Sequence, residues 1–191
     1  MKSTAIANAN IALVKYWGKR NEQLILPQNS SISMTTDKLS TITTVEFEPK
    51  YKKDTILFNG KKANAQDAQK ISNHLDLIRK IAGKKIFAKV QSKNNFPTSA
   101  GLASSSSGFA ALSVAAAHAL GLKLLPKELS IIARQGSGSA SRSIFGGFVE
   151  WKKGQSSDGS DSFAQQIAAP DYWRDFCMIA TVVSEEEKKI K

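Results

Sequence analysis

Cysteine and histidine are nearly absent from the 191-residue sequence, which contains only Cys177, His74 and His118. A single cysteine excludes an internal disulfide and a metal site built from several thiolates. Cys177 lies in the apolar run 176–183, so we expect it to be buried and chemically inert. Neither histidine has a partner at metal-ligand spacing, which favours structural or surface roles and predicts no metal site.

Long apolar runs are also lacking, because no stretch reaches the roughly 18 apolar residues that a membrane span requires. Residues 1–10 contain one early lysine and polar asparagines in place of the apolar segment of a secretion signal. The simplest interpretation is a cytoplasmic protein that does not bind a membrane.

Acidic residues are outnumbered, since 27 Lys and Arg face 16 Asp and Glu, giving a net charge of +11 and an isoelectric point near 9.8. This balance favours anionic partners such as nucleic acid, anionic lipid or phosphorylated small molecules. The lysines are scattered in pairs and form no long basic block, which is typical of a solvated surface. Charge alone therefore does not identify the partner.

The apolar periodicity mixes strand-like and helix-like segments without a regular β-α-β order, which predicts an α+β fold. Asn59 and Gly60 predict a hairpin turn. The clearest helix ends before Gly83, and its apolar stripe consists of Ala68, Ile71, Leu75, Ile78 and Ile81. The predicted strands are residues 6–16, 41–48, 53–58, 85–91, 145–151 and 176–184, the predicted helices are 64–82, 104–120 and 126–134, and the predicted loops are 21–33 and 153–162.

The most informative segment, the second of three in chain order, is 97–108, which reads Pro-Thr-Ser-Ala-Gly-Leu-Ala-Ser-Ser-Ser-Ser-Gly and leads directly into a helix of small residues. Gly101 permits a tight turn, and the hydroxyl and amide groups at the start of the helix can surround an anion. The segment has neither the Gly-Lys-Ser/Thr ending of a Walker loop nor the glycine spacing of a dinucleotide fingerprint. We interpret it as a phosphate-binding loop; the alternative is a serine-rich linker or a simple helix cap.

The first of the three segments in chain order, residues 8–19, places Lys15 and Lys19 on either side of Tyr16, Trp17 and Gly18. Two ammonium groups with a phenol between them can bind a diphosphate. Taken alone, however, the segment is better explained as an amphipathic strand end with surface lysines.

A third segment, residues 136–142, alternates Gly and Ser and ends at Arg142. Its small residues predict a loop that other groups can approach closely, and a guanidinium can bind a carboxylate or phosphate through two nitrogens. A flexible linker is the alternative, although linkers seldom continue into an apolar segment such as 143–151.

The three segments together resemble a known family. Residues 9–19 are similar to the N-terminal motif of the diphosphomevalonate decarboxylases, and residues 97–107 resemble the phosphate-binding motif of the wider superfamily of galactokinase, homoserine kinase, mevalonate kinase and phosphomevalonate kinase. Residues 136–142, with Gly146, Gly147 and Phe148, resemble the decarboxylases' Gly-Ser-Gly-Ser-Ala-Cys-Arg segment, with Ser141 in place of the cysteine.

This resemblance implies that residues 1–175 form the N-terminal domain of the small-molecule kinase superfamily, a ribosomal-protein-like α/β sandwich. Residues 176–191 would then begin a ferredoxin-like second domain that is largely missing.

The resemblance also implies a role for each matching residue. Arg142 would bind the substrate carboxylate with Asn10 orienting it, and Lys15 would lie near the tertiary hydroxyl, so Lys15 and Arg142 are the implied catalytic residues. The implied substrate pocket consists of Asn10, Tyr16, Trp17, Gly18, Lys19, Ser137, Gly138, Ser139, Ala140, Ser141 and Arg142. The implied ATP-binding residues are Pro97, Ser99, Gly101, Leu102, Ala103, Ser104, Ser105, Ser106 and Ser107, with Mg²⁺ accompanying the ATP.

The implied reaction is the ATP-dependent decarboxylation of mevalonate 5-diphosphate to isopentenyl diphosphate by a homodimeric carboxy-lyase of isoprenoid biosynthesis. ATP would phosphorylate the 3-hydroxyl, and departure of that phosphate would promote loss of carbon dioxide. The family's catalytic aspartate belongs to an Asp-Ala-Gly-Pro-Asn-like stretch, which does not occur here. We therefore expect that this chain alone does not turn over substrate.

Two other functions are compatible with the sequence. The closer one is a phosphomevalonate decarboxylase or a mevalonate kinase that acts on the 3-hydroxyl. The distant one is a basic RNA-binding module, which would need aromatic side chains interleaved with arginines on a sheet face. Tyr16 and Trp17 beside lysines are the only candidates for that pattern, and the chain has five arginines.

Overall fold

The fold is described from a computed structural model, which defines residues 1–96 and 104–179. Its organising element is β4 (Ser31–Phe47), a strand of 17 residues. β1 (Lys2–Val14) pairs with β4 antiparallel along almost its whole length. The other edge of β4 is shared, because β7 (Ala88–Asn94) pairs with its C-terminal half and β8 (Phe148–Trp151) pairs with its N-terminal end.

Further strands extend the sheet on both sides. β5 (Thr55–Phe58) lies parallel to β7 and pairs with β6 (Lys61–Lys62), whereas β9 (Ala164–Ala168) pairs with β8 at the opposite edge. The strand order is β6-β5-β7-β4-β8-β9, with β1 beside β4. β2 (Lys19–Asn21) and β3 (Leu26–Pro27) form a separate two-stranded hairpin.

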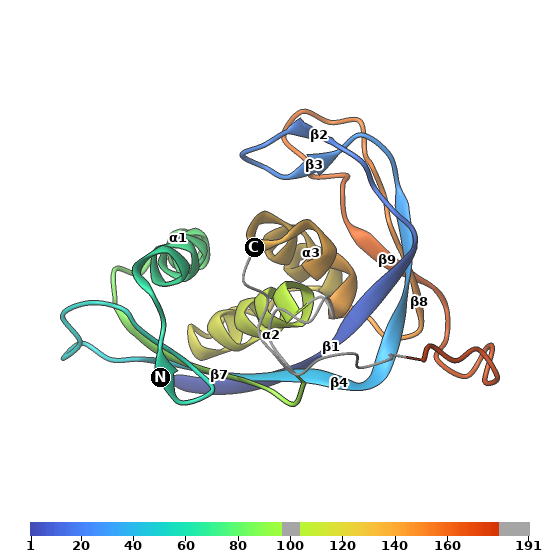
Figure 1. Ribbon diagram of the computed structural model, residues 1–191. Coiled ribbons are helices and arrows are strands. Elements are labelled where there is room, and N and C mark those ends of the chain that lie inside the picture. Colours follow the sequence, from blue (N-terminus) through green and yellow to red (C-terminus); the bar gives the residue numbers. More distant parts are fainter. Residues whose placement is uncertain (97–103, 180–191) are drawn as a thin grey trace.

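The helices cover one face of the sheet, which curves around α2 and α3 (Figure 1). They are α1 (Ala65–Ala82), α2 (Ser104–Ala119), α3 (Pro126–Gly136) and a 3₁₀ helix, η1 (Gly138–Ile144). None of the helices in residues 1–96 and 104–179 is long and apolar enough to cross a membrane.

Local signals set the ends of α1, the crossover between the parallel strands β5 and β7. The side chain of Asn64 accepts a hydrogen bond from the Asp67 amide at the N-terminus, which satisfies a free helix donor. Gly83 ends the helix with φ +62°, a left-handed conformation that favours glycine.

The main core lies between the helices and the C-terminal half of β4. Val45 and Phe47 are fully buried there against Leu75 and Ile78 of α1. α2 contributes small side chains, and its buried alanines are Ala110, Ala111, Ala115, Ala116, Ala117 and Ala119. Small residues let a helix approach a sheet closely, so burial of this apolar surface supplies the main stabilisation of the fold.

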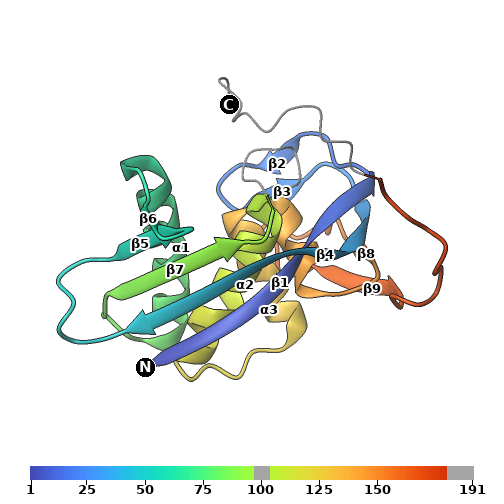
Figure 2. The ribbon, with the colours of Figure 1, turned by 60° about the horizontal axis from the view of Figure 1, so that its bottom comes forward.

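The other face of the sheet is uncovered, as Figure 2 shows for β1, β4 and β7. Ile6 and Ile42 are exposed neighbours on this face, and the Thr4 and Thr44 hydroxyls are hydrogen-bonded. Phe47, the one aromatic residue in these three strands, is buried. The aromatic and arginine pattern expected of an RNA-binding sheet is therefore not found in these strands.

Most of the predicted elements are confirmed. The strands predicted at 6–16 and 53–58 correspond to β1 and β5, the three predicted helices to α1, α2 and α3, and Asn59 and Gly60 form the turn between β5 and β6. The segment 41–48 is the C-terminal half of the longer β4. The strands predicted at 85–91 and 145–151 each begin three residues later than expected, as β7 and β8.

Several predictions were wrong. The predicted loop 21–33 contains the end of β2, β3 and the start of β4, because β2 and β3 pair with each other and the start of β4 pairs with the distant β8. The predicted loop 136–142 is helical, and β9 was missed. Residues 176–179 form no strand, residues 180–184 lie outside the described residues, and Cys177 is exposed instead of buried. Ile81 is 51% exposed, and in the last turn of α1 the residue that packs against the core is Ala82 instead.

Candidate functional site

Asn10 and Arg142, which are 132 positions apart in the sequence, form the centre of the candidate site. The Asn10 Oδ1 atom accepts hydrogen bonds from Arg142 Nε at 3.3 Å and Nη2 at 3.2 Å. Its Nδ2 group donates to the Ser139 carbonyl at 3.0 Å and to Ser143 Oγ at 2.8 Å. Arg142 Nη1 donates to Ser31 Oγ at 2.6 Å. The first and third sequence segments therefore meet through this network.

Arg142 is a buried cation whose described partners are all neutral. Its side chain is 2% exposed, and no carboxylate within residues 1–96 or 104–179 forms an ion pair with it. Burial lowers the pKa of Arg142 to about 10, although Tyr16 acts in the opposite direction. The group stays charged near neutral pH, and a buried charge without a counterion favours the binding of an anion from outside.

The segment around Arg142 has no room for larger residues at two of its glycines. A Cβ atom on Gly136 would lie 2.0 Å from the Phe109 ring. A Cβ atom on Gly138 would lie 2.8 Å from the Trp151 ring and 2.9 Å from the Tyr16 hydroxyl. The alternating Gly and Ser pattern therefore reflects close packing of a 3₁₀ helix, and not a flexible linker.

The serines of this segment point to different partners. The Ser137 hydroxyl lies 3.4 Å from the Ser139 hydroxyl, and both residues are partly buried. Ala140 and Ser141 are fully buried, and the Ser141 hydroxyl donates to the Gly138 carbonyl at 2.7 Å. Ser137 and Ser139 are thus the serines of the segment with surface available to a ligand.

The two aromatic residues that follow β1 have different surroundings. The Tyr16 ring packs edge-on against Trp151, with ring centroids 4.8 Å apart. Trp17, by contrast, is 75% exposed. The Asn29 side chain accepts from the Trp17 amide at 3.0 Å and donates to the Lys15 carbonyl at 3.0 Å, so it fixes the backbone of this turn.

The two lysines of the first segment are both accessible to solvent. The Lys19 ammonium forms an ion pair with Glu22 at 2.6 Å, and the Lys19 side chain is 33% exposed. Gly18, with φ +74°, makes the turn between the two lysines. A ligand diphosphate that binds Lys19 would compete with an exposed ion pair, which is weak in water.

The N-terminus of α2 connects the second segment to the third. The Ser105 hydroxyl lies 3.3 Å from the Ser137 hydroxyl, and the buried Ser107 hydroxyl lies 2.7 Å from Thr41 Oγ1 of β4. A helix N-terminus carries partial positive charge and attracts anions. Ser104 and Ser106 belong to the same turn, whereas Pro97, Ser99, Gly101, Leu102 and Ala103 lie outside the described residues.

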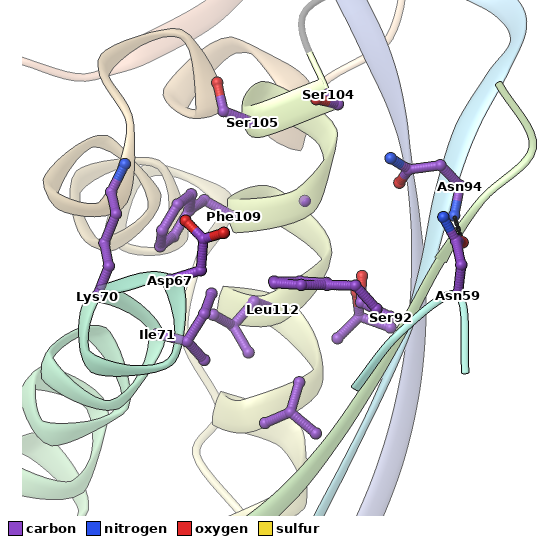
Figure 3. A pocket seen from close by; sticks show the side chains of 14 residues that line it. Asn59, Asp67, Lys70, Ile71, Ser92, Asn94, Ser104, Ser105, Phe109 and Leu112 are labelled. Carbon is purple, nitrogen blue, oxygen red and sulfur yellow. Dashed lines mark hydrogen bonds between the residues drawn. The ribbon is translucent and has the colours of Figure 1, made fainter. Parts of the chain in front are cut away.

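A cavity of about 230 Å³ opens beside this helix terminus, between α1, α2 and the strands β5 and β7 (Figure 3). Its apolar wall consists of Phe58, Ile71, Val90, Phe109 and Leu112. Its polar lining consists of Thr43, Asn59, Asp67, Lys70, Ser92, Asn94, Ser104 and Ser105. An apolar slot with a few polar groups at its edge is the usual form of a small-molecule pocket.

Lys70 is the cationic side chain that lines this cavity. Its ammonium lies 5.0 Å from the centroid of the Phe109 ring, within cation–π range. Figure 3 shows Lys70 and Asp67 on α1 and Ser105 at the start of α2. The cavity therefore has apolar walls and lies next to the helix terminus that attracts phosphate.

A bound Mg²⁺ has few ligands to draw on in the described parts of the chain. Within residues 1–96 and 104–179, no group of three or more His, Cys, Asp or Glu side chains is placed to hold a metal ion. Mg²⁺ keeps several waters and is commonly held by substrate phosphates. The residues present therefore fit a magnesium ion that arrives with a nucleotide.

Several residues at the site were missed by the sequence analysis. Ser31 and Asn29 lie in the segment 21–33 that was predicted as a loop, and Lys70 lies in the predicted helix 64–82 and was not singled out. Trp151 was identified only as part of a strand, yet its ring packs against Tyr16 and Gly138. For Asn29 and Ser31, the signal in the sequence was the run of serine and asparagine where β4 begins, because a polar run that enters a buried strand is unusual.

Comparison with known families supports the correspondence of the three segments. A family model described as the diphosphomevalonate decarboxylase-like N-terminal domain matches residues 7–164. A diphosphomevalonate decarboxylase of Ganoderma lucidum is 44% identical over 98% of this chain and 50% of its own length. The human diphosphomevalonate decarboxylase is 41% identical over 97% of this chain and 49% of its own length. The chain thus spans about half the length of these relatives.

Solved structures of mevalonate diphosphate decarboxylases are also similar to this chain. The mevalonate diphosphate decarboxylase of Enterococcus faecalis, described with mevalonate diphosphate mediated ATP binding, superposes with a TM-score of 0.83 and 52% identity over 88% of this chain and 52% of its own. The mevalonate diphosphate decarboxylase of Staphylococcus aureus superposes with a TM-score of 0.86 and 43% identity, over 96% of this chain and 57% of its own. A further similar structure is a complex with MVAPP, AMPPCP and magnesium. It superposes with a TM-score of 0.82 and 52% identity, over 88% of this chain and 51% of its own.

Proposed function

Because the chain belongs to the diphosphomevalonate decarboxylase-like family, we propose that it supplies the nucleotide- and substrate-binding half of a diphosphomevalonate decarboxylase. The reaction of the whole enzyme would be the ATP-dependent conversion of mevalonate 5-diphosphate to isopentenyl diphosphate. The observation that carries the proposal is Arg142, a buried cation that has no ion-pair partner among the described residues and is oriented by Asn10.

The proposed role of Arg142 is to bind the carboxylate that leaves as carbon dioxide. A guanidinium binds a carboxylate through two parallel hydrogen bonds, and Asn10 fixes the plane of the Arg142 guanidinium from one side. Lys15 would lie near the substrate's tertiary hydroxyl. These three residues provide the positioning and charge neutralisation on which phosphoryl transfer and decarboxylation depend.

The proposed diphosphate subsite lies at the turn that follows β1. Tyr16 and Lys19, with the Trp17 and Gly18 backbone between them, would line one side of it. Ser137, Gly138 and Ser139 would line the other, with Ala140 and Ser141 shaping the buried side. The packing of Tyr16 and Gly138 against the same Trp151 ring supports this arrangement.

The proposed ATP site combines the N-terminus of α2 with the adjoining cavity. Ser104, Ser105, Ser106 and Ser107 would bind the phosphates together with the segment 97–103, and the cavity lined by Lys70 and Phe109 would hold the nucleoside. ATP would supply the phosphoryl group for the 3-hydroxyl, and Mg²⁺ would accompany its phosphates. The Ser105–Ser137 contact supports the closeness of the two ligands that this transfer requires.

The same proposal includes the wider organisation of the protein. Residues 1–175 would form the N-terminal domain and residues 176–191 would begin a second domain. It also includes a homodimeric assembly, which follows the family resemblance, and a cytoplasmic location.

Calorimetric titration tests the proposal with mevalonate, its 5-phosphate and its 5-diphosphate, each with and without the magnesium complex of AMPPCP. We expect the diphosphate to bind most tightly, since Lys19 and Tyr16 would contact the distal phosphate. Arg142→Met should weaken that binding at least about 30-fold, as expected for loss of a buried charge partner. Arg79→Met is the control, because Arg79 is another buried arginine that lies outside the proposed site.

Equal affinity for all three compounds would contradict the diphosphate assignment. Tightest binding of the monophosphate would favour the phosphomevalonate decarboxylase instead, and tightest binding of mevalonate would favour the kinase.

A further inference from the structure

Arg134, in the last turn of α3, is a second buried arginine with neutral partners. Its side chain is fully buried, and no ion pair to it is found in the parts of the chain that the structure describes. Burial, together with the nearby charge of Arg20, lowers the pKa of Arg134 to about 10. A desolvated guanidinium is costly unless its N–H groups are hydrogen-bonded, so its partners indicate what it stabilises.

Those partners are backbone carbonyls from two segments that are far apart in the sequence. Arg134 Nε donates to the Leu24 carbonyl at 3.0 Å, in the β2–β3 hairpin. Its Nη1 group donates to the Gly159 carbonyl at 2.8 Å and to the Ser162 carbonyl, in the loop between β8 and β9. One side chain therefore connects α3 to both segments, which lie side by side in Figure 1.

The remaining N–H groups of Arg134 leave no room for a ligand. Nη2 has no hydrogen-bond partner among the residues that the structure describes, and a Cβ atom added to Gly159 would lie 2.7 Å from it. The same Cβ atom would lie 2.6 Å from the Leu26 side chain of β3. Gly159, with φ +72°, thus lets the loop pack directly on the guanidinium and on the hairpin. Arg134 connects protein segments and is not itself an anion site.

Both segments lead to the proposed diphosphate subsite. The hairpin carries Lys19 at its start. In the loop, the Ser162 hydroxyl accepts a hydrogen bond from the Trp151 indole at 3.1 Å, and the Trp151 ring supports Tyr16 and packs on Gly138. Displacement of either segment would therefore move a residue proposed to contact the substrate diphosphate.

We infer that Arg134 is a positioning residue for the diphosphate end of the site, an inference that rests on the proposed function. It holds the Leu24 hairpin and the 159–162 turn at a fixed distance from α3, so that Lys19 and Tyr16 face the Ser137–Ser139 segment. Preorganised binding groups depend on such supporting contacts, because a small misplacement of a ligand group has a large effect on affinity.

Hydrogen exchange and ligand titration together test this role in the full chain. Arg134→Met removes the donors at similar volume. Gly159→Ala disturbs the same contact from the loop side and keeps the charge. Arg79→Met controls for the loss of a buried arginine. Gly121→Ala controls for alanine at positive φ, because Gly121 has φ +79° and a Cβ atom there would contact nothing.

The expected signature is local. In Arg134→Met and Gly159→Ala, amide exchange should quicken in 19–27 and 155–162 and stay unchanged in 41–47. Affinity for mevalonate 5-diphosphate should fall about tenfold, whereas affinity for the magnesium complex of AMPPCP should change by a factor of less than about two. Both controls should leave the two affinities and the exchange of these two segments unchanged.

Two outcomes would overturn the inference: unchanged exchange in the hairpin and turn, or an equal loss of both affinities, which a purely structural role would cause. If the unmodified chain fails to bind mevalonate 5-diphosphate, the proposed function fails. The exchange result alone then decides whether Arg134 is a positioning residue. Faster exchange confined to the two segments would support this role, and uniformly faster exchange would contradict it.

Discussion

The two ends of β4 are buried by different chemistry. At the C-terminal end, Val45 and Phe47 pack among aliphatic side chains of α1 and α2. At the N-terminal end, Ser31 is equally buried and accepts a hydrogen bond from Arg142, which is in turn hydrogen-bonded to the buried Asn10. The Ser33 hydroxyl is buried there without a hydrogen-bond partner among the described residues. Apolar burial stabilises without needing directed partners, whereas each buried polar group requires hydrogen bonds. The apolar end therefore provides stability, and the polar end contains the residues proposed to bind the substrate.

The buried arginines sharpen this comparison. Arg79, at the apolar end, forms ion pairs with Asp54 at 2.5 Å and Asp76 at 2.7 Å. Burial acts to lower its pKa, but the hydrogen bonds to the two carboxylates outweigh burial and raise the pKa. Burial lowers the pKa of Arg134 and of Arg142, whose described partners are neutral. Arg79 is thus neutralised by two carboxylates of the protein, whereas Arg142, in the proposed function, would be neutralised by the substrate carboxylate.

The largest expected effect separates stability from binding. Phe47→Ala should lower the free energy of unfolding by about 3–5 kcal/mol, because it leaves a cavity in the apolar end. Affinity for mevalonate 5-diphosphate, measured where the variant is still folded, should change by a factor of less than about two. Urea unfolding followed by circular dichroism measures the first quantity, and calorimetry measures the second.

Ile42→Ala is the matched control, since Ile42 lies on the uncovered face of the same strand and is 43% exposed. Its cost should stay below about 1 kcal/mol. A comparable loss of substrate affinity in Phe47→Ala would show that the two ends of β4 are energetically coupled, contrary to the comparison.

His74 is a second buried polar residue at the apolar end, after Arg79. It is 2% exposed, and its Nε2 atom lies 2.8 Å from the Ser113 hydroxyl, which donates to the Phe109 carbonyl at 2.7 Å. Burial, helped by the charge of Lys70, lowers the pKa of His74 from 6.5 to about 4. The unfolded chain therefore binds this proton more readily, and stability is lost as the pH falls through 6.5 towards 4.

The free energy of unfolding should fall by about 2 kcal/mol from about pH 7 to about pH 5 because of His74 alone. His74→Gln should remove most of this slope, whereas His118→Gln, at an exposed position of α2, should keep it. Urea titrations at successive pH values measure the slope. An unchanged slope in His74→Gln would show that other groups cause the pH dependence.

The sequence predicted the apolar end better than the polar end. The stripe from Ala68 to Ile78 identified α1, because apolar residues at helical spacing are themselves the signal of a helix with one buried face. Asn10 and Arg142 were identified through their sequence segments, and their direct hydrogen bonds were found only in the structure. Ser31 was assigned to a loop because its asparagine- and serine-rich surroundings favour turns, whereas pairing with β8 makes it part of a strand.

Arg134 had no sequence signal at all. Its partners are backbone carbonyls, and the Leu24 carbonyl lies 110 positions away. A carbonyl is present at every residue, so no pattern of side chains marks the contact. Buried polar contacts of this kind depend on the complete tertiary fold, which limits what periodicity can predict.

The smallest expected effect concerns Ser141, which replaces the cysteine common in the resembling family. Its hydroxyl donates to the Gly138 carbonyl at 2.7 Å inside η1. A thiol is a weaker donor of similar size, so Ser141→Cys should change the free energy of unfolding by less than about 1 kcal/mol. Ser141→Ala leaves the carbonyl without this donor and should cost about 1–2 kcal/mol. Because the hydroxyl points into the turn, calorimetry should find substrate affinity unchanged in Ser141→Cys. A marked loss would instead place Ser141 in direct contact with the ligand and would extend the binding surface of the polar end to this buried position.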